Sequence, residues 1–249
     1  MIYFIRHSAR LDYEDMKKWE KMERFKENES DPPLSKDGEK IALQQIEKIM
    51  NDKYDTDEDI DFIYSSPFAR CIETAIIFRK YILKKYKINV KIRIDYGLSP
   101  QFPGDFIYWF GSDNSNIIIK NGKFIQKTTP KFLDNDMMQK EIYKKYNSNN
   151  FDIKYESKTL FDNINKIVSY QDSVNDRLES INKIANILSG FSIVCTHGEV
   201  IMLIKNFLEK EWQPDRKNLF GGRNYCGGIE CKKTKTKLLL NEIINGNLY

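Results

Sequence analysis

The sequence predicts an α/β protein whose central sheet is mostly parallel and covered by helices on both faces. Short apolar runs alternate along the chain with longer stretches in which apolar residues recur at helical spacing. Strands that alternate with helices form parallel sheets, because each helix returns the chain to the edge where the next strand begins. A stretch with neither pattern, from about residue 96 to 170, interrupts the alternation and is expected to be an insertion within a single domain of residues 1–249.

The composition is that of a globular chain. It has 249 residues, 41% of them hydrophobic, and a net charge of +4 from 40 basic and 36 acidic residues, which is too balanced to indicate a nucleic-acid partner. No apolar run is long enough to span a bilayer, and Arg6 interrupts the first one, so neither a membrane segment nor a secretion signal is expected. The sequence leaves the oligomeric state open.

Cysteine and histidine usage points to a reducing compartment. The four cysteines form no CxxC pair, and neither of the two histidines stands at ligand spacing from a cysteine. We therefore expect reduced, buried thiols, no metal site and a cytoplasmic location.

The N-terminal half carries three expected strands and two expected helices. The first strand, Ile2–Ile5, ends at Arg6 and His7, and a polar connection with a weak helical pattern follows over residues 11–31. The rigid turn Asp31–Leu34 leads to Ser35, which is expected to cap a helix. The next strand is followed by Ser65-Ser66-Pro67, a helix start in which proline takes the first helical position and Arg70 falls in the first turn. The helix after Ser35 is expected to bury Ala42, Ile46, Ile49 and Met50, and the helix after Pro67 is expected to bury Cys71, Ala75, Phe78 and Ile82. The other two strands are expected at Phe62–Tyr64 and Val90–Ile94, with a solvated acidic loop at Asp55–Asp61.

The C-terminal half repeats the alternation. A helix is expected to begin at Asp172-Ser173 and to end at Gly190, before a buried strand over Phe191–Cys195. That strand ends at Thr196-His197, and a second amphipathic helix with Val200 and Phe207 on its apolar side follows. The tail is expected to form a hairpin from strands 225–231 and 238–243 about a turn rich in lysine and threonine.

The two histidines stand at equivalent places in the predicted fold. His7 and His197 each follow directly on a short apolar strand. If these strands are parallel neighbours, both imidazoles reach the crevice at the carboxyl ends of the strands, where ligands bind in open α/β sheets. Either histidine alone is equally compatible with a structural role, but the equivalent placement of both favours a functional site.

Four motifs follow one another in a fixed order along the chain: Ile5-Arg6-His7-Ser8-Ala9-Arg10, Asp31-Pro32-Pro33-Leu34-Ser35-Lys36-Asp37-Gly38, Tyr64-Ser65-Ser66-Pro67-Phe68-Ala69-Arg70-Cys71-Ile72-Glu73-Thr74-Ala75 and Cys195-Thr196-His197-Gly198. Together they resemble the histidine phosphatase superfamily, which has the phosphoglycerate-mutase-like fold. The likeness runs from residue 2 to about 210 and implies a three-layer fold with residues 96–170 as a cap. Arg10 makes the first motif most similar to the phosphatase domain of the phosphatases that also carry ubiquitin-associated and SH3 domains, and Ser8 replaces the usual glycine.

The resemblance implies a phosphomonoester hydrolase that works without a metal or other cofactor. His7 would attack phosphorus and form a phosphohistidine, Arg6, Arg10 and Arg70 would bind the phosphate, and His197 would donate to it. The residue types suit these roles, because a neutral imidazole is a nucleophile and planar guanidinium groups match phosphate oxygens. The expected substrate is a phosphorylated small molecule or a phosphoprotein, whose identity the sequence leaves open.

The proton donor is the role that the motifs do not place. Superfamily members carry a glutamate two residues after a leucine that follows the third strand, and here Pro100 stands at that position after Leu98. Glu199, two residues after His197, and Asp105 are the candidates. Two other functions stay open: a cofactor-dependent phosphoglycerate mutase, which shares the fold and the nucleophile, and a phospho-ligand-binding module with weakened catalysis, which Pro100 favours.

Overall fold

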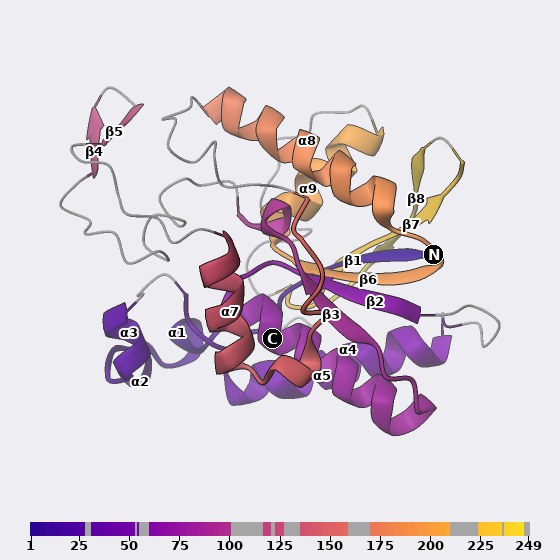
Figure 1. The fold of residues 1–249 in the computed structure, drawn as a ribbon, viewed down its shortest axis with the longest axis horizontal. Helices are drawn as coiled ribbons and strands as arrows, with labels where there is room; N and C mark the ends of the chain where they lie inside the picture. The colour runs from indigo at the N-terminus through magenta and orange to yellow at the C-terminus, as the bar shows by residue number, and fades with distance from the viewer. Residues whose placement is uncertain are drawn as a thin grey trace.

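The computed structural model describes residues 1–27, 31–52, 54, 60–100, 117–120, 123–126, 135–158, 170–209, 224–235 and 237–246. Within them, six strands form a central sheet in the order β3-β2-β6-β1-β7-β8 (Figure 1). Four strands run parallel, and two antiparallel strands complete one edge. The strands that pair in parallel are β1 (Ile2–Arg6), β2 (Ile60–Ser65), β3 (Lys91–Ile94) and β6 (Phe191–Thr196). β7 (Gly228–Lys233) pairs antiparallel with β1, and β8 (Leu238–Ile244) pairs antiparallel with β7. The predicted α/β class with a mostly parallel sheet is confirmed.

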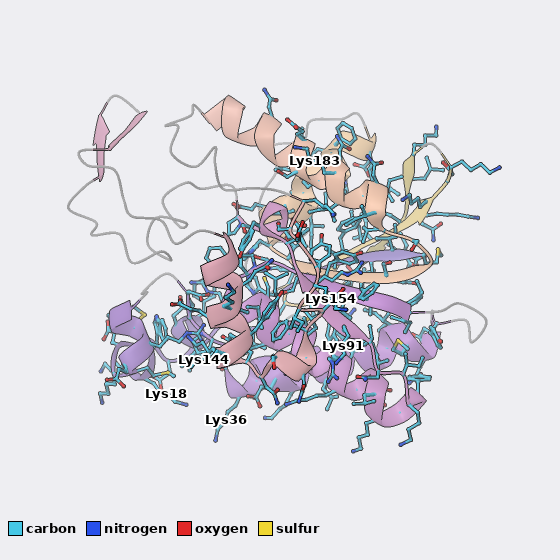
Figure 2. All side chains as sticks on the ribbon, in the orientation of Figure 1. Lys18, Lys36, Lys91, Lys144, Lys154 and Lys183 are labelled. Carbon is cyan, nitrogen blue, oxygen red and sulfur yellow. The ribbon has the colours of Figure 1, made fainter. Side chains whose placement is uncertain are left out.

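Helices cover both faces of this sheet. Figure 1 shows α4 (Lys36–Asp52) and α5 (Ala69–Tyr86) below the strands and α8 (Tyr170–Ile187) and α9 (Gly198–Glu209) above them. The alternation of side chains along β1 explains the two layers, since successive residues of a strand point to opposite faces. Tyr3 and Ile5 pack into the core with α4 and α5, whereas Ile2 and Phe4 pack into the core with α8 and α9. Figure 2 shows the described side chains on both sides of the sheet.

The predicted helix starts are only partly right. Ser35 caps α4 as expected, because its Oγ accepts a hydrogen bond from the backbone N–H of Gly38 at 2.9 Å. The expectation that a serine caps α5 with Pro67 in the first helical position is wrong: α5 begins at Ala69. The N–H of Ala69 donates to the carboxylate of Asp31 at 2.8 Å. A carboxylate that is distant in sequence therefore does the work expected of a local hydroxyl.

Smaller differences concern the ends of elements. The weak pattern after β1 forms three short helices, and α8 begins at Tyr170, two residues before the expected start. Phe207 of α9 is exposed, although it was expected on the apolar side. The C-terminal hairpin of β7 and β8 is confirmed, and all four cysteines are free and buried as predicted. The short helices are α1 (Leu11–Glu14), α2 (Met16–Glu20) and α3 (Glu23–Glu27).

Part of the expected insertion is built into the main body. α7 (Asn135–Lys145) contributes Ile142 and Tyr143 to the core on the α4 and α5 face, and Phe151 joins them and forms a backbone bridge with Ile92 of β3. The other described pieces are η1 (Tyr96–Leu98), the hairpin of β4 (Ile117–Lys120) and β5 (Lys123–Gln126), and η3 (Ser148–Asn150). The rest of the stretch lies outside the described residues, as do residues 55–59 of the acidic loop, so the cap stays a prediction. No helix in the described ranges is long and apolar enough to cross a membrane.

Candidate active site

The two histidines meet at the carboxyl ends of β1 and β6. These strands are parallel neighbours, and their register sets Arg6 opposite Thr196. The backbone N–H of His7 continues the ladder by donating to the carbonyl of Thr196 at 2.8 Å. The two imidazole rings are 5.4 Å apart between centroids, in an edge-to-face arrangement, and each histidine is 4% exposed. The predicted convergence of the two strand ends is confirmed.

His7 is held as a neutral imidazole with one defined tautomer. Its Nδ1 lies 2.8 Å from the backbone carbonyl oxygen of Ser8. Because a carbonyl oxygen only accepts, Nδ1 carries the proton and Nε2 keeps its lone pair. Burial, followed by the positive charges of Arg70 and Arg6, holds the pKa of His7 well below its ordinary value of 6.5. At neutral pH the ring is therefore uncharged and has a lone pair on Nε2.

His197 has the opposite tautomer. Its Nδ1 lies 3.4 Å from Nη2 of Arg70, which can only donate, so Nδ1 accepts. Nε2 then carries the proton and donates to Oγ of Ser66 at 2.9 Å. The thiol of Cys71 is 3.5 Å from the same Nε2. Burial raises the pKa of this thiol to about 12, so Cys71 stays protonated and acts as a packing group.

Arg6 is fixed by residues that the sequence reasoning missed. Its Nη1 donates to the backbone carbonyl of Asn224 at 3.3 Å, and its guanidinium lies 5.2 Å from the centre of the Tyr225 ring. Asn224 is itself held, since its Oδ1 accepts from the N–H of Gly246 at 2.8 Å and a Cβ on Gly227 would collide with its amide. Arg6 is 6% exposed, and burial lowers the pKa of its guanidinium. No local motif pointed to residues 224 and 225.

Arg70 is held by a carboxylate instead. It is the second residue of α5, is 3% exposed, and has its Nη1 3.6 Å from Oδ1 of Asp31. The other oxygen of Asp31 accepts from Arg24 at 3.1 Å, and Arg24 also lies 3.3 Å from Glu73. Arg70 thus stands at the end of a row of alternating charges. The guanidinium also lies 4.6 Å from the ring centre of Phe68.

Arg10 lies next to the site with its side chain engaged elsewhere. Its Nε and Nη2 donate to the two carboxylate oxygens of Asp12 at 3.0 and 2.5 Å, and its guanidinium stacks 4.4 Å from the Tyr13 ring centre. Its charge nevertheless contributes to lowering the pKa of both His7 and Arg6. The assignment of Arg10 to phosphate binding stays a prediction.

Ser8 fits directly after His7, because its hydroxyl has a partner on the neighbouring helix. The Oγ of Ser8 donates to the carbonyl of Gly38 at 2.7 Å, and its backbone N–H donates to Oγ1 of Thr74 at 3.1 Å. Gly38 is required at this contact, because a Cβ there would collide with the carbonyl oxygen of Ala9. Ser8 therefore ties the loop that carries His7 to the starts of α4 and α5.

The candidates for the proton donor differ in what the structure says of them. Glu199 lies in the first turn of α9 and is partly exposed, two residues after His197. Pro100 is buried at the position expected for a glutamate, and Asp105 lies outside the described residues. Asp95 is a buried carboxylate after β3, but it accepts hydrogen bonds from the Tyr155 hydroxyl at 2.6 Å and from two backbone N–H groups, so it serves to hold the chain after β3. Within the described ranges, no group of three or more potential metal ligands is arranged to hold an ion.

Comparison with known proteins agrees with this geometry. Residues 2–99 match the family model of the histidine phosphatase superfamily (branch 1), and this segment contains Arg6, His7, Arg10 and Arg70. No curated protein matches the sequence.

Solved phosphatase structures share the fold along nearly the whole chain. The ecdysone phosphate phosphatase from Bombix mori, solved with tungstate, has a TM-score of 0.61 at 15% identity, over 100% of this chain and 96% of that one. A phosphoserine phosphatase from Entamoeba histolytica, solved with 3-phosphoglyceric acid, has a TM-score of 0.51 at 14% identity, over 98% and 96%. A putative alpha-ribazole-5'-P phosphatase from Escherichia coli has a TM-score of 0.53 at 14% identity, over 98% and 95%. The central sheet with helices on both faces is thus the phosphoglycerate-mutase-like fold.

Proposed function

We propose that this chain, with its histidine phosphatase signature and fold, is a phosphomonoester hydrolase that works through a phosphohistidine at His7 without a metal. The observation that carries the proposal is the state of His7: a buried neutral imidazole whose Nδ1–H is bound to the Ser8 carbonyl, leaving Nε2 as the nucleophile. The charges of Arg70 and Arg6 act on this imidazole, and both guanidinium groups are nearly buried.

The first step transfers the phosphoryl group to the protein. Nε2 of His7 attacks phosphorus in line, the N–P bond forms, and the bond from phosphorus to the leaving-group oxygen breaks. The Ser8 carbonyl accepts the Nδ1–H and so stabilises the positive charge that the ring acquires. Arg6 and Arg70 would donate to the equatorial oxygens, where charge accumulates in the transition state, and His197 would join them once the bound phosphate protonates its Nδ1.

The second step releases phosphate. Water attacks the phosphohistidine, the N–P bond breaks, and inorganic phosphate leaves with Nε2 of His7 restored. We assign the protonation of the leaving group, and the removal of the proton from water, to Glu199, which follows His197 closely in the chain. A weak or displaced acid costs about 10²- to 10⁴-fold in rate. A phenolate leaving group needs the acid least, so an aryl phosphate is the most informative first substrate.

His7→Ala tests the proposal directly. Hydrolysis of p-nitrophenyl phosphate should fall by about 10⁴-fold or more, because no other group replaces the nucleophile. Wild-type protein quenched during turnover should carry an acid-labile phosphoryl group at His7, and the variant should carry none. Unchanged turnover in a His7→Ala variant with a native circular dichroism spectrum would show that another group attacks.

The phospho-ligand-binding alternative keeps one supporting observation, the buried Pro100 at the expected position of the acid. It predicts micromolar to millimolar binding of phosphate or vanadate with no turnover of any phosphate ester. Phosphoryl transfer between bisphosphoglycerate and monophosphoglycerate would instead indicate the mutase. A phosphorylated small molecule or a phosphoprotein remains the proposed substrate, and the closer kinship to the phosphatases with ubiquitin-associated and SH3 domains rests on Arg10 alone.

A further inference from the structure

Asp31 makes contacts with two adjacent residues at the start of α5. Its Oδ1 accepts the backbone N–H of Ala69 at 2.8 Å and lies 3.6 Å from Nη1 of Arg70. Its Oδ2 accepts from Nη2 of Arg24 at 3.1 Å. Asp31 is 2% exposed and comes from the rigid turn before α4, so one carboxylate from a separate segment fixes both the first turn of a helix and the guanidinium that this turn carries.

We propose that Asp31 is the positioning residue for Arg70, an inference that rests on the proposed phosphatase function. It acts by holding the Arg70 guanidinium against His197, whose Nδ1 is 3.4 Å from Nη2. Phosphoryl transfer depends on donors that are fixed before the charge develops, and a misplacement of about 1 Å can cost about 10²-fold in rate.

The surrounding charges make this arrangement rigid. Arg24 bridges Asp31 and Glu73, and Glu73 accepts the backbone N–H of Leu34 at 2.7 Å and lies 3.2 Å from the hydroxyl of Tyr146. Two carboxylates and two guanidinium groups alternate here. Asp31 and Arg70 are buried and Arg24 and Glu73 are partly exposed. Removing a neighbour of the buried pair leaves an uncompensated charge, so the neighbours hold that pair in place.

A simpler role must be separated from this one. Asp31 also caps α5, and loss of a cap alone lowers the stability of the folded protein. A cap acts on folding and is indifferent to the side chain at position 70. A positioning residue acts on catalysis and loses its effect once Arg70 is gone.

A double-mutant cycle distinguishes the two roles. Asp31→Ala should lower kcat/KM for p-nitrophenyl phosphate by about 10- to 100-fold, and Asp31→Asn, which keeps an oxygen for the Ala69 N–H, provides a second variant with the cap intact. In an Arg70→Ala background the same Asp31 changes should cost less than about threefold, since residues that act as a unit are not additive. Asp37→Ala is the matched control: this carboxylate near the start of α4 pairs with Lys40 on the surface at 2.8 Å and should leave kcat and KM unchanged.

The outcomes separate this inference from the proposed function. An equal loss in both backgrounds, or wild-type kinetics in a folded Asp31→Ala variant, would overturn the positioning role while leaving the phosphatase proposal intact. If the wild type shows no turnover, the proposed function fails. The same four proteins are then compared by their dissociation constants for inorganic phosphate. Coupling between positions 31 and 70 in that constant supports the positioning role. Additive changes, or no phosphate binding by the wild type, overturn it.

Discussion

Arg6 and Arg70 both lower the pKa of His7, but different kinds of contact hold the two guanidinium groups in place. Arg6, at the end of β1, contacts a backbone carbonyl and an aromatic ring, and burial lowers the pKa of its guanidinium. Arg70, in the first turn of α5, lies beside the carboxylate of Asp31. If the proposed function holds, a phosphate dianion would stabilise the Arg6 side of the site more than the Arg70 side, because the charge of Arg6 is costly to bury. The charge of Arg70 is already balanced by Asp31, so the contribution of Arg70 is its fixed position.

Removing each arginine should expose this difference most strongly. Loss of one fixed donor typically costs about 10²- to 10³-fold in rate. We expect Arg6→Ala at the lower end of this range and Arg70→Ala at or above its upper end, because Arg70→Ala also leaves Asp31 facing the phosphate. The measurement is kcat/KM for p-nitrophenyl phosphate. An Arg6→Ala defect larger than that of Arg70→Ala would contradict the comparison.

Replacing the aromatic ring next to Arg6 should have a smaller effect than removing either arginine. Tyr225 is buried, and its ring centre lies 5.2 Å from the guanidinium carbon. A desolvated cation–π contact is worth about 1–2 kcal/mol, so Tyr225→Leu should weaken inhibition by inorganic phosphate about 5- to 30-fold. Tyr225→Phe keeps the ring and should stay within about twofold of wild type. If both variants weaken the inhibition equally, the hydroxyl and not the ring supports Arg6.

The smallest expected effect is on the pKa of His7. The charge of Arg70 lowers this pKa more than that of Arg6, so Arg70→Ala should raise it further than Arg6→Ala does. Because the chain has two histidines, nuclear magnetic resonance titration can follow both rings directly. The reverse order of the two shifts would show that Arg6 is the stronger influence on His7.

The lowered pKa of His7 also makes the stability of the folded protein depend on pH. Below about pH 6.5 the unfolded chain binds a proton at His7 that the folded protein excludes. Wild-type stability should therefore decrease as the pH falls from about 6.5 towards the lower folded pKa, by up to about 1.4 kcal/mol per pH unit. Arg70→Ala should raise the pKa of His7 in the folded protein, so the pH range over which stability falls should end at a higher pH than in the wild type. Urea unfolding at several pH values measures this.

The parts of the site that follow strand ends were predictable from the sequence. His7 and His197 each come directly after a short apolar run, and parallel strands bring their carboxyl ends to one edge. The same local reasoning placed the cap of α4, where Ser35 and Gly38 are three residues apart. Such features depend on spacing along the chain, which a sequence displays.

The residues that hold the arginines were not predictable in the same way. Asp31 lies 38 residues before the N–H that it caps, and Asn224 lies 218 residues after Arg6. Their roles arise from packing between distant segments, and no periodicity or motif reports it. The local rule for α5 failed for the same reason: the hydroxyl of Ser66 is engaged by His197, and a tertiary carboxylate takes its place at the helix start.

The position of β6 in the sheet has a consequence for how the protein folds. β6 lies between β1 and β2, so these two early strands touch only through a strand formed some 190 residues after the first. The segment that carries the superfamily signature ends at residue 99, before this strand and before His197. Loops of this length are slow to close. Recovery of activity during refolding should therefore coincide with the last, long-range step of sheet assembly, and a fragment ending at residue 99 should neither complete the sheet nor bind phosphate.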